Sequence, residues 1–99
     1  MNNLEKIKIG YKTYEIIRTQ ENVALMTNAN ICYGQIMYDD RKIYLNENIK
    51  DETTLIHEVL HGVDDMYNIG LSEEQIDIMA KGLYMLLDDN NLDITTVHK

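Results

Sequence analysis

DETTLIHEVLHGVDDMYNIG, residues 51–70, is the segment in which the hydrophobic pattern of the chain becomes helical. Its apolar residues recur every three or four positions, as on one buried helix face: Leu55, Ile56, Val59, Leu60, Val63, Met66 and Tyr67. Residues 51–54 offer capping groups and negative charge for the start of the helix. Asn68–Ile69–Gly70 predicts its end, with Gly70 suited to the left-handed position after a helix.

A second helix is predicted directly after the first. Ser72 begins it, and Gln75 stands three residues later, where the partner of a capping box is expected. Its apolar stripe consists of Ile76, Met79, Ala80, Leu83, Leu86 and Leu87. Two amphipathic helices joined by so short a connection are expected to pack against each other.

The first half of the chain has the patterning of strands. Residues 6–17 alternate apolar and lysine positions, as in a half-buried strand or hairpin, and Gly10 marks a turn. Residues 31–37 and 42–45 flank YDDR, which predicts a hairpin with its turn at Asp39–Asp40. Residues 20–29 fit a short helix or an irregular connection. The predicted fold class is α+β, a small antiparallel sheet of about three strands followed by two packed helices.

Composition limits the kind of protein. Ninety-nine residues are enough for one domain, residues 1–99, and all seven aromatic residues are Tyr, so Ile, Leu, Val and Met should form the core with tyrosines at its margin. A net charge of −8 argues against nucleic acid and against an anionic membrane surface as partners. No segment has the ~20 apolar residues of a membrane span. The single Cys32, expected in the core or a strand, fits a reducing, cytoplasmic setting.

The clearest chemical signal is the pentapeptide HEVLH, residues 57–61. Residues four apart share one helix face, so the imidazoles of His57 and His61 can reach a single ion. Zinc binds imidazole nitrogen and lowers the pKa of a coordinated water towards ~7. Glu58 can hold and deprotonate that water. Two surface histidines beside a carboxylate are the competing interpretation, which the uncharged residues flanking the motif disfavour.

A catalytic zinc site needs a third protein ligand. A histidine six residues after His61 would complete a longer zinc motif, but Tyr67 stands there. We take Ile76, Ala80, Leu83 and Leu87 of the second helix to face the first helix. Glu73 then lies nearest the edge of this face, Asp77 lies next, and Glu74 points away. We therefore predict Glu73 as the third ligand.

Other carboxylates stay open as the third ligand. They are Asp77, Glu74 and Asp65, the last of which stands four residues after His61. If Glu73 binds the metal, Asp77 is expected to accept a hydrogen bond from a ligand histidine and fix its tautomer. Acidic residues are also favoured at a helix N-terminus without any metal, which is the competing explanation for Glu73 and Glu74.

LIHEVLHGVDD followed by EEQIDIMA resembles the ImmA/IrrE-type small zinc peptidases of phages, integrative elements and bacteria. The second helix of that family carries Glu-x-x-Ala-Asn/Asp-x-Phe-Ala, from which Ile76 and Met79 depart. The resemblance covers residues 54–87 and implies a minimal zincin-like, gluzincin-type core. By this resemblance His57, His61 and Glu73 bind zinc and Glu58 is the general acid/base, while GLYMLLDDN is similar to very small phage-encoded members.

Peptidases of this kind usually have a further His or Tyr that polarises the scissile carbonyl group. Tyr44, Tyr67 and Tyr84 are candidates, although core packing is the role we expect for each. His98, in the terminal tail, is expected to be an inert surface residue.

These features predict a zinc metallopeptidase that hydrolyses a peptide bond in a cytoplasmic protein. The substrate would lie extended beside an edge strand, for which residues 42–45 are the candidate. Because ImmA-type enzymes cleave transcriptional repressors, the resemblance implies a regulatory protein of a phage or mobile element as substrate. The alternative is a non-catalytic zinc-binding interaction or inhibitor module of the same origin, docking onto a basic protein. A structural zinc is disfavoured because such sites favour Cys.

Overall fold

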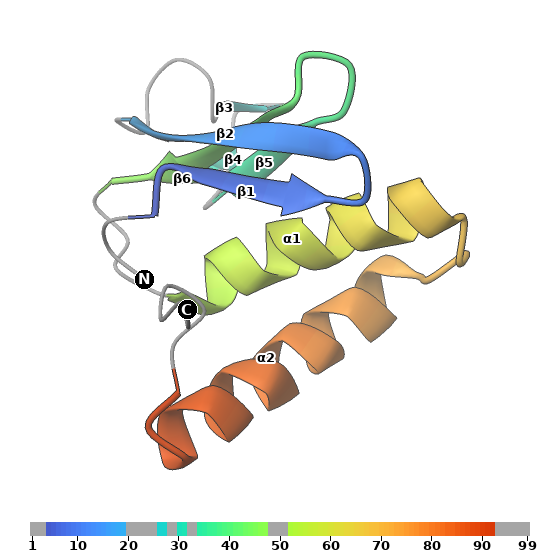
Figure 1. Ribbon diagram of the computed structural model, residues 1–99. Coiled ribbons are helices and arrows are strands. Elements are labelled where there is room, and N and C mark those ends of the chain that lie inside the picture. Colours follow the sequence, from blue (N-terminus) through green and yellow to red (C-terminus); the bar gives the residue numbers. More distant parts are fainter. Residues whose placement is uncertain (1–3, 20–25, 28–29, 32–33, 48–51, 93–99) are drawn as a thin grey trace.

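The computed structural model describes residues 4–19, 26–27, 30–31, 34–47 and 52–92 (Figure 1). In this part of the chain a four-stranded sheet is followed by two helices, so the α+β prediction is confirmed. The predicted sheet of about three antiparallel strands was slightly wrong, since the sheet has four strands and one pair is parallel. Cys32, Asp51 and His98 lie outside the described residues.

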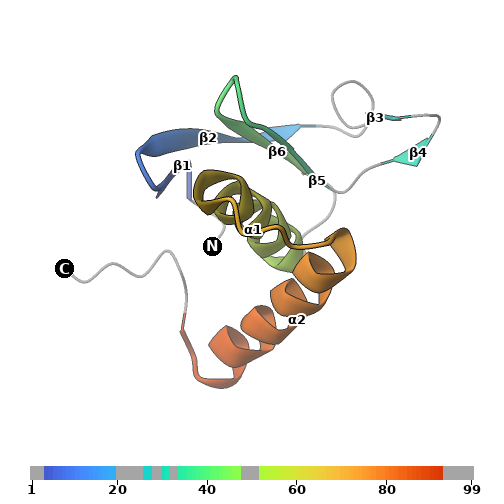
Figure 2. The same ribbon diagram turned by 90° about the vertical axis from the view of Figure 1, so that its right-hand side faces the viewer.

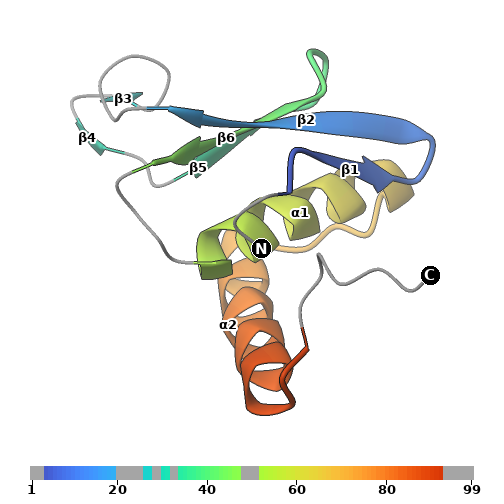
Figure 3. The same ribbon diagram turned by 60° about the vertical axis from the view of Figure 1, so that its left-hand side comes forward.

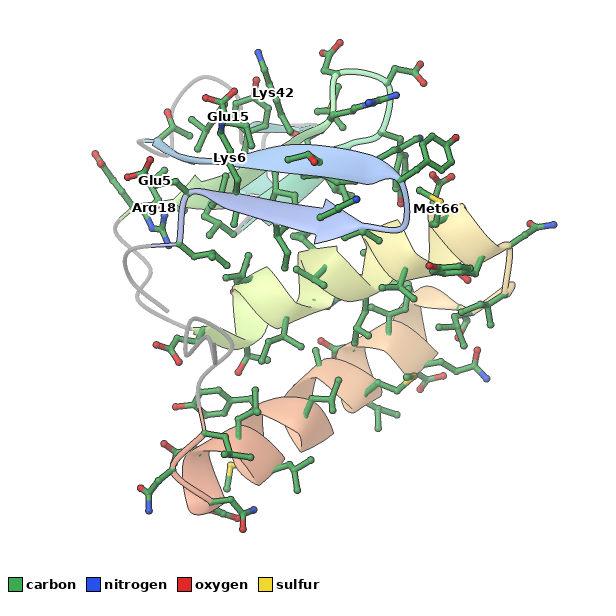
Figure 4. All side chains as sticks on the ribbon, viewed as in Figure 1. Glu5, Lys6, Glu15, Arg18, Lys42 and Met66 are labelled. Atoms are coloured by element: carbon green, nitrogen blue, oxygen red, sulfur yellow. The ribbon has the colours of Figure 1, made fainter. Side chains whose placement is uncertain are left out.

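The first two strands form the predicted hairpin. β1 (Lys6–Ile9) pairs antiparallel with β2 (Lys12–Thr19). Gly10 lies in the turn with φ of 63°, a left-handed conformation that glycine adopts without strain. A Cβ at this position would lie only 2.5 Å from Cγ of Met66, which stands beside the turn (Figure 4). The turn therefore needs glycine for its backbone and for its contact with the helix.

The second hairpin is also confirmed, but its place in the sheet differs from the prediction. β5 (Gly34–Met37) pairs antiparallel with β6 (Lys42–Asn46), and β6 pairs parallel with β2. The strand order is β1-β2-β6-β5, so residues 42–45 lie in a central strand and their prediction as an edge strand was wrong. A separate two-stranded ladder joins β3 (Met26–Thr27) to β4 (Asn30–Ile31).

Most of the hydrophobic core lies between the sheet and α1 (Glu52–Tyr67), the first helix, and Ala80 of the second helix extends it on the other side of α1. Its buried members are Ile9, Tyr14, Ile16, Ile43, Leu45, Leu55, Ile56 and Ala80. Tyr14 is completely buried, so the expectation that tyrosines stay at the margin was wrong for this residue. α1 comes close to the sheet at Gly62, where a Cβ would stand 2.7 Å from Cδ1 of Ile9.

α2 (Glu73–Asp89) begins with the predicted capping box. Ser72 Oγ accepts a hydrogen bond from the Gln75 backbone N–H at 3.0 Å, and the Ser72 N–H donates to Gln75 Oε1 at 2.8 Å. Before it, Gly70 has the expected left-handed backbone, with φ of 88°. These local groups fix where the second helix starts, and therefore where its first side chains point.

α1 lies between the sheet and α2, as two rotated views show (Figures 2 and 3). Among the described elements α2 contacts only α1. Ile76 and Ala80 are buried in that contact, but Leu83, which the sequence analysis also placed on the face towards α1, is exposed, as are Met79 and Leu86 of the apolar stripe. Neither described helix combines the length and apolarity that crossing a membrane would require.

Candidate metal centre

The two histidines of α1 come together on the side that faces α2. Their Nε2 atoms lie 3.2 Å apart, and their ring centroids lie 4.9 Å apart with the rings inclined at 60°. Both side chains are largely buried. The helix accounts for this convergence, since residues four apart lie one above the other on the same face.

Glu73, the first residue of α2, completes the group. Its Oε2 lies 2.8 Å from Nε2 of His57, and its Oε1 lies 2.8 Å from Nε2 of His61. The capping box at Ser72 and Gln75 holds the backbone on either side of Glu73. A carboxylate 12 residues after His61 is thus brought to both imidazoles by the packing of the two helices.

The geometry of these residues fits a metal ion. One ligand atom from each of His57, His61 and Glu73 lies within 4.8 Å of the others. In a tetrahedral zinc site with Zn–N bonds of about 2.0–2.1 Å, two ligand nitrogens are about 3.3 Å apart. The 3.2 Å between the two Nε2 atoms matches that separation. The group could therefore hold a metal ion with three protein ligands. A zinc ion held in this way would keep its fourth tetrahedral position for water or substrate.

The other carboxylates considered as the third ligand do not join the converging group. Asp77 Oδ1 is 3.7 Å from Nδ1 of His57, longer than a hydrogen bond, and Asp77 Oδ2 pairs with Lys81 Nζ at 3.1 Å. Asp77 therefore lies beside Nδ1 of His57, the ring nitrogen that does not face Glu73, but the predicted hydrogen bond between them is not formed. Asp65 pairs with Lys12 of the sheet at 3.7 Å, and exposed Glu74 does not belong to the converging group.

Glu58 occupies a different environment from its two neighbours in the motif. Its side chain is buried on the side of α1 that meets β5, where a Cβ on Gly34 would lie 3.3 Å from its Cγ and its Oε2. Burial, helped by the negative charge of Glu73, raises the pKa of Glu58 from 4.5 to about 7. A carboxyl group with this pKa can both accept and donate a proton near neutral pH.

Asp64 is a positioning residue that the sequence analysis missed. Its Oδ1 accepts hydrogen bonds from the backbone N–H groups of Gly70 at 2.8 Å and Leu71 at 2.9 Å. The Asp64 carbonyl oxygen also accepts from Ile69 N–H. Asp64 therefore ties the loop between the helices to α1. An acidic residue near the C-terminus of a helix opposes the helix dipole, and this mismatch was the available signal.

The three tyrosines considered as carbonyl-polarising residues have different surroundings. Tyr67 is 62% exposed, so the expected core packing was wrong for it. Tyr84 packs against the core, as expected. Tyr44 is half-buried in the central strand β6, opposite Gln35 and Ile17. These placements assign the carbonyl-polarising role to none of them.

Comparison of the chain with family models, with curated proteins and with solved structures gave no match.

Proposed function

We propose that this protein is a zinc-dependent metallopeptidase acting on a cytoplasmic protein. The observation that supports this most strongly is the convergence of His57, His61 and Glu73, with the buried carboxyl group of Glu58 on the same helix. Two imidazoles and one carboxylate form a donor set used by catalytic zinc sites, and the absence of Cys from this set is unlike most structural sites. The resemblance to ImmA/IrrE-type peptidases points to the same chemistry.

Each residue has a distinct role in this proposal. His57, His61 and Glu73 hold the metal and leave one coordination position open. Zinc bound there would acidify a water molecule and polarise the substrate carbonyl group. Glu58 takes a proton from the attacking water and delivers it to the leaving amine. Burial raises the pKa of the Glu58 carboxyl group above that of an ordinary glutamate, which helps Glu58 to retain the proton until it is delivered to the leaving amine.

The substrate is proposed to bind as an extended peptide along β5. This strand is an edge of the four-stranded sheet, so one side of its backbone can pair with another chain. Its first residue, Gly34, packs against Thr54 and Glu58 of α1. A peptide paired with β5 would therefore pass close to the general base. β5 replaces residues 42–45, which lie in the centre of the sheet, as the proposed substrate strand.

The test combines metal analysis with cleavage of a peptide library. Protein purified without chelator should contain about one zinc per chain, and it should cleave a subset of library peptides. Glu58→Gln should keep the zinc and lose at least ~100-fold of the cleavage rate, because only the proton transfer is removed. His61→Ala should lose both zinc and cleavage. A zinc-free wild type under metal-replete conditions would contradict the proposal.

The alternative proposal is a non-catalytic module that binds zinc and a basic protein. The observation in its favour is the charge of the helical half, since residues 52–92 contain nine Asp and Glu residues and one Lys. Glu58→Gln separates the two proposals. If this variant keeps both its zinc and the biological effect of the wild type, catalysis is unnecessary and the binding module is the better explanation.

A further inference from the structure

The side of α2 that faces away from α1 carries an exposed apolar surface. Its large residues are Ile78 (62% exposed), Met79 (42%), Leu83 (37%), Met85 (50%) and Leu86 (54%). At 100° per residue these positions occupy an arc of about 160° centred near Gly82, which also contains Gln75 and Asp89 towards the two ends of the helix. We call these five apolar residues, together with Gly82, the outer face. None of the described strands contacts α2, so no described element covers the outer face (Figures 2 and 4).

Gly82, at the centre of the outer face, is a second observation that points to a partner helix. A Cβ at this position would meet no atom within 4 Å, so the fold itself does not require glycine here. Glycine inside a helix is destabilising relative to alanine. A missing side chain in the middle of an apolar face allows the backbone of a second helix to approach closely, as small residues do wherever helices cross at short range.

The charge beside the outer face indicates what kind of partner fits. Glu74 and Asp88 stand beside one edge of the arc, and Asp89 lies within it near the end of the helix. Lys81, the one cation of α2, is paired with Asp77. A second copy of this chain would bring another acidic helical half against this edge, and like charges repel. A partner with Lys or Arg beside its apolar residues would instead gain complementary charge.

We propose that the outer face binds an amphipathic helix of a basic protein, whose apolar side crosses α2 at Gly82 and whose cationic side faces the carboxylates of Glu74, Asp88 and Asp89. This mode is the docking of a helix onto an apolar helical surface, with charge selecting the partner. It does not depend on the proposed peptidase activity, because Glu73 contacts the histidines from the opposite side of α2.

The experiment uses two synthetic peptides of about 18 residues, a length sufficient for a helix. Both carry Leu at the same helical positions, and one has Lys where the other has Glu. Fluorescence anisotropy of each labelled peptide is measured with the full chain. The Lys peptide should bind, and added salt should weaken its binding. The Glu peptide should not bind. Equal binding of both peptides, or binding of neither, would overturn the proposal.

Variants locate the binding on the outer face. The double variant Ile78→Ser/Leu86→Ser should weaken Lys-peptide binding at least ~10-fold, and Gly82→Leu should weaken it by blocking close approach. Tyr11→Ser is the matched control, since Tyr11 is 72% exposed on the distant β1–β2 turn. Circular dichroism and zinc content should be unchanged in all three. Unchanged peptide binding in the outer-face variants would show that the peptide binds to acidic surface in general.

Sedimentation and vesicle binding test the other possible occupants. The wild type should sediment as a monomer at micromolar concentration, and phosphatidylcholine vesicles should not bind it. A dimer that Ile78→Ser/Leu86→Ser dissociates would assign the outer face to a second copy of this chain. Vesicle binding that the same variant abolishes would assign it to a membrane. Either result would overturn the proposal.

Discussion

The two sides of α1 make different kinds of contact. The side that faces the sheet is closely packed, with Gly62 against Ile9 and with Leu55 and Ile56 buried in the core. The side that faces α2 holds His57 and His61, and among the described elements α1 alone contacts this second helix. One helix therefore combines an apolar contact that secures the fold with a polar contact that can bind a metal.

The difference suggests how the site and the fold depend on each other. Removing a residue from the sheet side should affect the whole domain, whether or not metal is bound. Removing a ligand on the α2 side should affect metal binding first. The position of α2 rests on Ile76, Ala80, the loop anchored by Asp64 and, in the proposed holoprotein, on the bond from Glu73 to the metal.

The largest effect on stability is expected from Ile43→Ala. Ile43 is completely buried in the central strand β6, so the truncation leaves a cavity and should lower the free energy of unfolding by about 2–5 kcal/mol. Leu83→Ala on α2, where Leu83 is 37% exposed, should lower it by less than half as much. Urea denaturation with chelator measures both. Equal effects would show that the outer face of α2, to which Leu83 belongs, is as important for stability as the core between α1 and the sheet.

Removal of a metal ligand should change the stability gained from zinc without changing the stability of the metal-free fold. Zinc at 100 times its dissociation constant should stabilise the wild type by about 2.7 kcal/mol. His61→Ala should abolish this gain, because one of two imidazole ligands is lost, while its stability in chelator should stay close to that of the wild type. Thermal unfolding with and without zinc provides the measurement. A zinc-induced shift as large in His61→Ala as in the wild type would contradict the metal site.

The buried carboxyl group of Glu58 predicts a pH dependence in chelator-treated protein. Burial raises the pKa of Glu58 to about 7 in the folded chain, whereas the ordinary value is 4.5. Below pH 4.5 both states are protonated, so Glu58 causes no loss of stability there. As pH rises from 4.5 to 7 the unfolded chain ionises first, and the folded state loses on the order of 3 kcal/mol.

Glu58→Gln should remove this loss, so the variant should be more stable than the wild type above pH 7 and gain little below pH 4.5. Glu74→Gln, at an exposed position beside the site, serves as the control and should change stability little at either pH. Urea denaturation at pH 4, 6 and 8 tests both variants. A Glu58→Gln gain that is the same at all three values would contradict the buried ionisation.

A smaller effect is expected from the anchor of the interhelical loop. Asp64→Ala removes the acceptor of two backbone hydrogen bonds and should lower stability by about 1–2 kcal/mol. It should also weaken zinc binding, because the loop positions Glu73. Asp64→Asn, which keeps an acceptor oxygen, should restore most of both properties. Asp65→Ala, one residue further on, is the matched control, and an equal loss of zinc affinity in it would contradict the positioning role.

Much of this architecture could be predicted from local sequence signals. Gly10, the YDDR turn, Gly70 and the Ser72–Gln75 capping box each act over a few residues. Both hairpin turns, the end of α1 and the start of α2 could therefore be located from the sequence. The parallel pairing of β2 with β6 could not be predicted, because apolar and polar residues alternate in residues 42–45 in the same way whether the strand is central or at an edge. The convergence of His57 with His61 follows from helical spacing alone, whereas the approach of Glu73 depends on how two helices pack.

The exposure of the outer face was the other feature that the sequence could not predict. A helical wheel shows that Met79, Leu83 and Leu86 share an apolar arc with the buried residues, but only the structure shows that nothing described covers them.

The smallest predicted effect concerns Gly82, at the centre of the outer face. Gly82→Ala should stabilise the chain by about 0.5–1 kcal/mol, because alanine favours the helix and its Cβ meets no atom within 4 Å.

Gly62→Ala is the matched substitution on the other helix, where a Cβ would stand 2.7 Å from Ile9 and should destabilise the chain. Opposite signs in urea denaturation would show that one glycine serves the contact inside the fold and that the other is dispensable for folding. If Gly82→Ala were destabilising as well, the outer face would be packed against part of this chain and would not be free for a partner.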